Sequence, residues 1–170
     1  MTHRTAVLKP DYHYTGTDVP FDKSVAAIMA LLRQHKCERI GLMYETVGGV
    51  EAATLVFQKD GLPYRIDFPL TYVEKHRVER GHRSTNQYSP LVKELRMQIS
   101  GRIIHDRVKA LLIDAEIGIL DFSQAMIQFL LVPGSGGRPE PLSDYVLGHR
   151  DQLAKGTFDI TYQLPEGRSP

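Results

Sequence analysis

The stretch EAATLVFQKDGLPYRIDF, residues 51–68, decides the fold of this chain. Two runs rich in β-forming residues, Glu51–Gln58 and Leu62–Phe68, flank the dipeptide Asp60-Gly61. Asp and Gly both accept positive φ, so this pair is a strong signal for a tight hairpin turn. We therefore predict two antiparallel strands over these residues.

The second run of the hairpin alternates between apolar and charged residues. Tyr64, Ile66 and Phe68 share one face of the strand, and Arg65 and Asp67 share the other. This pattern is typical of an antiparallel sheet with one buried face and one solvated face.

A strand and a helix are predicted upstream of the hairpin. Arg39–Tyr44 is a short β-like run, separated from the hairpin by a turn at Gly48-Gly49. Residues 21–35 carry apolar side chains at helical spacing. These are Val25, Ile28, Met29, Leu31 and Leu32. We expect this helix to cover the apolar face of the sheet.

Downstream of the hairpin, we predict a long loop and then a long helix. Residues 71–88 are polar, basic and punctuated by glycine, and a connection of this length is often functional. Residues 91–116 are predicted to form a helix, with Gly118 as its C-terminal cap. Its apolar residues form two stripes: Leu91, Val92, Leu95, Ile99 and Ile103, and then Met97, Ile104, Val108, Leu111 and Ala115. Either the helix bends near Ser100-Gly101 or its second stripe contacts another subunit.

The C-terminal part predicts smaller elements. We expect a short helix passing into a strand over 121–132, a hairpin tip at PGSGGRPEP (133–141), a helix over 143–155 and an edge strand at TFDITYQL (157–164). The predicted organisation is an extended N-terminal arm (1–20), one domain (21–155) and a tail (156–170). The predicted fold class is α+β, a three- or four-stranded antiparallel sheet packed against an N-terminal helix and a long central helix.

Composition limits the class of protein. The chain has 170 residues, of which 42% are hydrophobic and 24% charged, close to the average of globular domains. No run of about 18 apolar residues is present, and the N-terminus lacks the apolar core of a signal peptide. We expect a cytoplasmic protein with no membrane partner.

Charge is unevenly distributed along the chain. The net charge is +1, but residues 71–110 carry nine Lys and Arg against four Asp and Glu, whereas residues 111–170 carry four against eight. The basic block is either a nucleic-acid-binding surface or one half of a neutralising pair with the acidic block. For the first case, the predicted phosphate contacts are Lys75, Arg77, Arg80, Arg83, Lys93 and Arg96.

The sequence gives no pattern typical of a catalytic or metal site. The seven histidines lack the spacing that sets two imidazoles on one helix face, and Cys37 is the single cysteine. Nucleophile-elbow, phosphate-loop and dinucleotide-binding motifs are absent from the sequence. We therefore predict no catalytic residues, no metal and no cofactor.

Three segments resemble a group of short, functionally uncharacterised proteins encoded by bacteriophages and prophages. They are SVAAIMALLRQHKCERIGLMYE (24–45), ATLVFQKDGLPYRIDFPL (53–70) and AEIGILDFSQAMIQFLLVPGSGG (115–137). The resemblance implies a mobile-element setting and a cytoplasmic site of action, and it brings no catalytic residues. The order helix, three strands, helix also resembles the double-stranded RNA-binding domain, in topology alone.

Two functions are consistent with these patterns. The first is a non-enzymatic nucleic-acid-binding accessory protein of a phage or prophage, which contacts phosphates through the basic loop and the start of the long helix. The second is a protein–protein interaction module, either a homo-oligomer or an inhibitor of a host factor, whose partner interface is Met97, Ile104, Val108 and Leu111.

Overall fold

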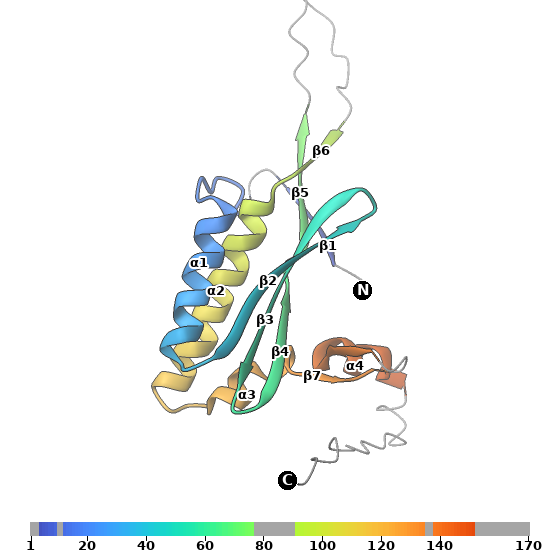
Figure 1. The fold of residues 1–170 in the computed structure, drawn as a ribbon. Helices are drawn as coiled ribbons and strands as arrows, with labels where there is room; N and C mark the ends of the chain where they lie inside the picture. The colour runs from blue at the N-terminus through green and yellow to red at the C-terminus, as the bar shows by residue number, and fades with distance from the viewer. Residues whose placement is uncertain (1–3, 10–11, 77–90, 135–137, 152–170) are drawn as a thin grey trace, which may run out of the picture.

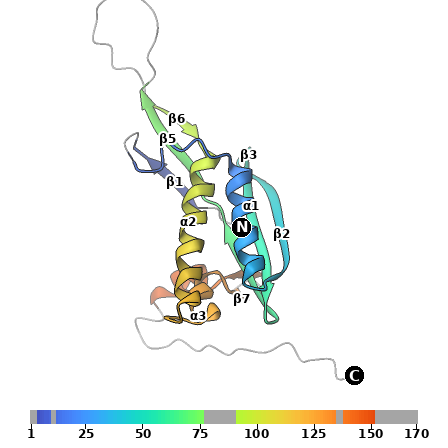
Figure 2. The same ribbon diagram turned by 90° about the vertical axis from the view of Figure 1, so that its left-hand side faces the viewer.

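The computed structural model describes residues 4–9, 12–76, 91–134 and 138–151. They form an α+β fold, which confirms the predicted class. Helices α1 (Phe21–Gln34) and α2 (Met97–Glu116) cover one face of the antiparallel sheet β2-β3-β4, as Figures 1 and 2 show. The two layers meet in one apolar core.

The predicted strands of this sheet are confirmed. β2 (Glu38–Val47), β3 (Val50–Lys59) and β4 (Leu62–Asp67) are joined by two-residue turns, with Val47 paired to Val50 and Lys59 paired to Leu62. All four turn residues have positive φ: Gly48 (59°), Gly49 (81°), Asp60 (52°) and Gly61 (79°). Gly and Asp tolerate this conformation better than most residues, so the two turns form at these positions. The position of each turn fixes which residues of the adjoining strands pair.

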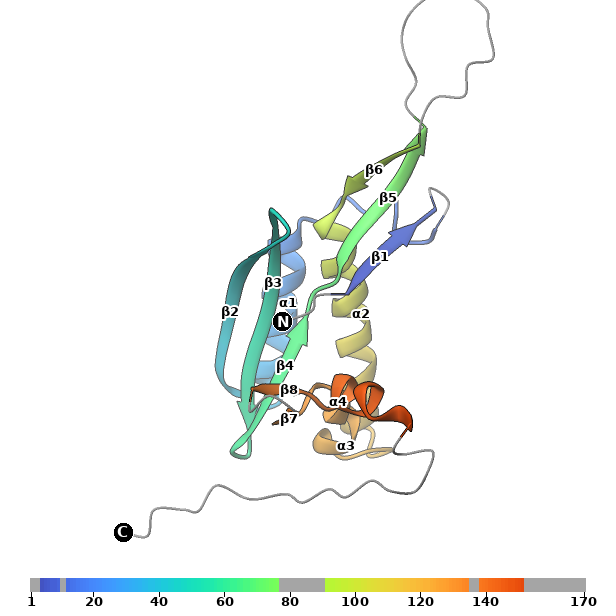
Figure 3. The same ribbon diagram turned by 90° about the vertical axis from the view of Figure 1, so that its right-hand side faces the viewer.

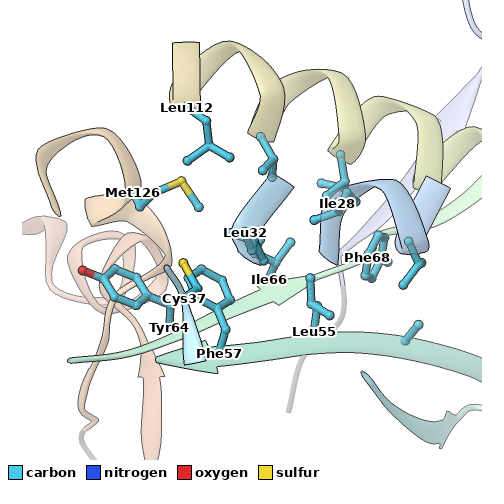
Figure 4. Close-up of a cluster of buried hydrophobic side chains, with 14 residues drawn as sticks. Ile28, Leu32, Cys37, Leu55, Phe57, Tyr64, Ile66, Phe68, Leu112 and Met126 are labelled. Carbon is cyan, nitrogen blue, oxygen red and sulfur yellow. The ribbon is translucent and has the colours of Figure 1, made fainter. Parts of the chain in front are cut away.

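The core lies between the sheet and the helices (Figure 4). α1 contributes Ile28 and Leu32, β4 contributes Tyr64 and Ile66, and Phe68 follows directly after β4 on the same face, as the alternation predicts. Aromatic rings pack closely at both ends of β4, where Phe57 stacks on Tyr64 and Phe21 meets Phe68 edge to face. The remaining members are Val25, Cys37, Ala53, Leu55, Phe57, Ile104, Val108, Leu112 and Met126.

The two long helices run in the same direction and approach closely near their N-termini. At Gly101, a Cβ atom would lie 2.9 Å from Cδ2 of Phe21 and 3.2 Å from Cβ of Ser24. At the other end, Nε2 of His35 lies 3.1 Å from a carboxylate oxygen of Glu116. The absence of a side chain at position 101 is therefore what permits the close contact of α1 with α2.

We predict that Gly101→Val lowers the free energy of unfolding by about 2 kcal/mol, because the new side chain overpacks the contact with Phe21 and Ser24. Urea unfolding followed by circular dichroism measures the change. Ala110→Val introduces the same side chain at an exposed position of α2 and should cost about 0.5 kcal/mol. Equal costs for the two variants would contradict the packing argument.

The chain leaves the main sheet at Phe68-Pro69 and enters a second sheet, of order β1-β5-β6. β5 (Leu70–His76) pairs antiparallel with β6 (Leu91–Leu95). The prediction of a loop from residue 71 is therefore wrong for 71–76. There, the β-formers Thr71, Tyr72 and Val73 find partner strands on both sides of β5.

The prediction of a helix from residue 91 is also wrong for its first turn. Residues 91–95 form β6, in which Lys93 lies opposite Glu74, a favourable cross-strand pair. The helix begins at Met97, and its end at Glu116 is confirmed. Three residues of the first predicted apolar stripe thus belong to a strand, which removes the reason for a bend.

The described N-terminal residues, 4–9 and 12–20, contact the rest of the fold at two places. β1 (Thr5–Leu8) pairs parallel with β5, from Thr5 opposite Leu70 to Leu8 opposite Val73. Farther along, the hydroxyl of Tyr14 donates to Asp106 on α2 at 3.3 Å. Residues 1–20 were predicted as an extended arm, and the described part of this arm lies against β5 and α2.

The C-terminal elements lie beside the beginning of β4, where Tyr64 forms a β-bridge with Leu130 (Figure 3). α3 (Phe122–Met126) starts with a capping box between Asp121 and Gln124, and η1 (Ile127–Phe129) leads into β7 (Leu131–Pro133). β7 pairs with β8 (Pro139–Pro141), and α4 (Leu142–Gly148) follows. The helix-to-strand prediction is confirmed. Of the helix predicted over 143–155, α4 covers residues up to Gly148, and residues 152–155 lie outside the described part of the chain. The predicted strand 157–164 lies outside the described residues.

Candidate functional site

Three of the six predicted phosphate-binding residues, Lys75, Lys93 and Arg96, lie in or directly after the β5–β6 hairpin. Lys93 is exposed on β6, and Lys75 lies on β5 with its Cα paired to Val92. Arg77, Arg80 and Arg83 lie outside the described residues. The described strands extend past the N-terminal ends of α1 and α2 in all three views (Figures 1–3). The hairpin is thus a projection from the two-layer body.

Arg96 lies where the hairpin joins α2. Its backbone N–H donates to the carbonyl of Thr71 at 2.8 Å. With the Gln98 amide oxygen turned toward it, the guanidinium donates from Nε at 2.8 Å and from Nη2 at 2.9 Å. Gln98 is a neutral partner, so this contact positions the guanidinium without neutralising its charge.

The predicted partner interface, Met97, Ile104, Val108 and Leu111, lies on the side of α2 that faces the core. Ile104 and Val108 are 7% and 0% exposed and belong to the core, while Met97 and Leu111 are half-buried and pack against it. This stripe of α2 packs against the core residues of α1 and the sheet of the same chain. It therefore offers no free apolar face to a partner.

A cavity that the sequence does not reveal lies at the edge of β4 that faces away from β3. Its volume is about 380 Å³, within the range of small-molecule sites. Three arginines line it: Arg4, which directly precedes β1, Arg65 of β4 and Arg107 of α2. The other lining residues are Thr5, Ala6, Asp67, Pro69, Ile103, Ile104, Gln128, Phe129, Pro141, Ser143 and Asp144.

Arg65 is held by a buried ion pair with Asp67. Its Nε lies 2.8 Å and 3.1 Å from the two carboxylate oxygens of Asp67, and its Nη2 lies 2.6 Å from Oδ2. The two side chains are 8% and 18% exposed. The hydroxyl of Thr54 donates to the same carboxylate at 2.9 Å. The bidentate ion pair and the burial of both side chains fix the position of the Arg65 guanidinium at the cavity wall.

The other two arginines are more exposed. Arg4 donates from Nη2 to Asp144 at 2.6 Å, with 64% of its side chain exposed. Arg107 donates to the amide oxygen of Gln128, and its Cζ lies 5.9 Å from the centre of the Phe129 ring. Gln128 and Phe129 carry no charge, so neither contact neutralises Arg107.

Sequence reasoning missed this cavity for two reasons. The alternation in YRID indicates a solvated face for Arg65 and Asp67, but the C-terminal elements and β1 cover that edge of β4. The three arginines are also far apart in sequence and lack a common motif. A charged i, i+2 pair within an apolar strand was the single available signal.

Cys37 has the environment of a core residue and not of a nucleophile. It is buried, and burial raises the pKa of its thiol to about 11; Lys59 opposes this effect and Asp60 adds to it. Among the described residues, no group of three or more His, Cys, Asp and Glu side chains is placed to hold a metal ion. His105 instead lies 2.8 Å from Asp106, which also binds Arg102 at 3.3 Å.

We predict that iodoacetamide labels Cys37 at pH 8 at least about 100-fold more slowly in the native protein than in urea. A pKa near 11 leaves about one thiol in a thousand ionised, against about one in ten at the ordinary value of 9.0. Because the pKa is raised, the thiol stays neutral until the pH approaches the folded value. Intact-protein mass spectrometry gives both rates, and rates within about threefold would contradict the buried position.

We predict that Asp67→Asn lowers the free energy of unfolding by about 3 kcal/mol, because it leaves the buried charge of Arg65 without a carboxylate. Urea unfolding measures the loss. Asp60→Asn makes the same chemical change in the Lys59–Asp60 pair, where the Asp60 side chain is 71% exposed, and should change stability by less than about 0.5 kcal/mol. A small effect at both positions would refute the structural role of the buried pair.

No protein-family model, curated protein or solved structure matches this chain. In the part of the chain that the structure describes, the helices are too short or too polar to cross a membrane.

Proposed function

We propose that this is a non-enzymatic nucleic-acid-binding accessory protein that contacts phosphates through the β5–β6 hairpin and the start of α2. The observation that carries the proposal is the projection of β5 and β6 beyond the two-layer body (Figure 1). A projecting hairpin offers a phosphate backbone access that a flat sheet face does not.

The charge of the segment supports this proposal. Residues 71–110 carry nine Lys and Arg against four Asp and Glu. Lys93 is exposed on the hairpin, and Arg96 is held at its base by neutral partners. By connectivity, residues 77–90 join β5 to β6 and bring Arg77, Arg80 and Arg83 into the same segment. Cations grouped in this way bind phosphates by releasing counterions.

The setting that we infer is the cytoplasm of a cell that carries a phage or prophage. The single cysteine and the likeness of residues 24–45, 53–70 and 115–137 to phage and prophage proteins support this inference. In this setting the protein would bind nucleic acid as part of DNA metabolism or of interference with the host.

The test is fluorescence anisotropy with labelled single-stranded DNA, duplex DNA and RNA over a range of salt concentrations. We expect binding at micromolar protein concentration in low salt. The Kd should rise steeply as the salt concentration increases. The variant Lys93→Ala/Arg96→Ala should lower the slope of log K against log salt by about 1.5, since each phosphate contact contributes about 0.7 to 0.9. The absence of binding to every probe at about 10 µM protein would refute the proposal.

A second variant and a matched control locate the contact. Arg77→Ala/Arg80→Ala/Arg83→Ala should lower the salt slope by about 2 to 3. Lys23→Ala/Arg33→Ala/Arg150→Ala removes the same charge from exposed positions of the body and should leave the Kd within about twofold. An equal loss in both triple variants would mean that net charge, and not the hairpin, determines binding.

A further inference from the structure

We propose that the cavity at the edge of β4 binds a small organic anion, with one carboxylate or phosphate group on a compact planar apolar body. The volume of about 380 Å³ suits a molecule of the size of an aromatic acid or a nucleoside monophosphate. The lining of this cavity contains none of the hairpin residues proposed to contact nucleic acid.

The charge balance of the cavity favours an anion. Its lining contains three arginines and two aspartates. Asp67 pairs with Arg65, and Asp144 pairs with Arg4. Arg107 has the neutral partners Gln128 and Phe129. The described lining thus retains one uncompensated positive charge, which attracts an anion of low charge, while the two carboxylates disfavour a polyanion.

Arg65 supplies preorganised donors. A guanidinium has five N–H groups, and Asp67 takes those of Nε and one from Nη2. No acceptor among the described residues binds Nη1, and this atom is not among the buried groups sealed from solvent. Because the ion pair with Asp67 already holds the side chain, an incoming oxyanion gains these hydrogen bonds with little further loss of entropy.

Arg4 can exchange its partner. Its ion pair with Asp144 is exposed, and exposed pairs of this kind contribute at most about 1 kcal/mol. A ligand oxyanion in the cavity can therefore replace Asp144 as the partner of Arg4 at small cost. Arg4, which directly precedes β1, would then contact the ligand together with Arg107 of α2.

The remaining wall explains why the anion should have an apolar body. Phe129, Ile103 and Pro141 line the cavity beside the arginines, and the Arg107 guanidinium lies next to the Phe129 ring. A free inorganic anion would leave this surface in contact with water. A planar apolar group attached to the anion would bury it.

The test is a two-dimensional amide NMR titration of the full chain with four probes: benzoate, adenosine monophosphate, and their neutral counterparts benzamide and adenosine. We expect at least one anion to bind with a Kd below about 1 mM, and its counterpart at least tenfold more weakly. Shifts should concentrate at residues 4–6, 65–69, 103–107 and 128–129. Benzoate and adenosine monophosphate distinguish a carboxylate ligand from a phosphate ligand.

Two variants test the role of the uncompensated charge. Arg107→Gln should weaken binding of the anion at least tenfold, whereas Lys109→Gln, which removes an exposed charge of α2 outside the cavity, should change it less than about twofold. Arg107 is itself exposed, so its replacement does not endanger the fold. Three results would each overturn the proposal: no shifts with either anion at about 5 mM, shifts confined to other residues, or equal binding by the neutral probes.

Discussion

The burial of one face of β4 is the constraint on which the rest of this structure depends. Tyr64, Ile66 and Phe68 fill the space between β3 and the two helices, and this fixes the position of the whole strand. Because side chains alternate along a strand, the same burial directs Arg65 and Asp67 to the opposite side. The chain then passes through Pro69 into β5, so the anchored strand also sets where the hairpin leaves the body.

Much of this arrangement could be predicted from local patterns. The turns at Gly48-Gly49 and Asp60-Gly61 have strict conformational needs, and the apolar spacing of α1 is regular, so these elements were found with nearly correct bounds. Residues 91–95 were assigned to the wrong class, because Leu, Val and Leu at these positions suit a helix as well as a strand. Pairing with β5 decides between the two, and a partner strand is not visible in local spacing.

The candidate sites, too, depend on tertiary contacts that local sequence patterns do not show. The basic block is visible in sequence because its members are consecutive, but the fold divides it between different surroundings. Lys93 lies on the hairpin, Arg102 binds Asp106, and Arg107 lines the cavity with Arg65. Grouping residues by their position in the sequence therefore assigns too many cations to the hairpin surface. It also fails to reveal the cavity. The cavity depends on the contact of β1, β4 and α2, which only the tertiary structure shows.

The parallel pairing of β1 with β5 has a consequence for folding. A parallel pair needs a long crossover, and here the connection contains α1, β2, β3 and β4. Closing so large a loop costs more chain entropy than forming either hairpin of the main sheet, which favours pairing of β1 after those hairpins have formed. Once in place, it covers one edge of β5. Any process that withdraws residues 5–8 leaves that strand with an unpaired edge, the part of a sheet most prone to pair with another chain.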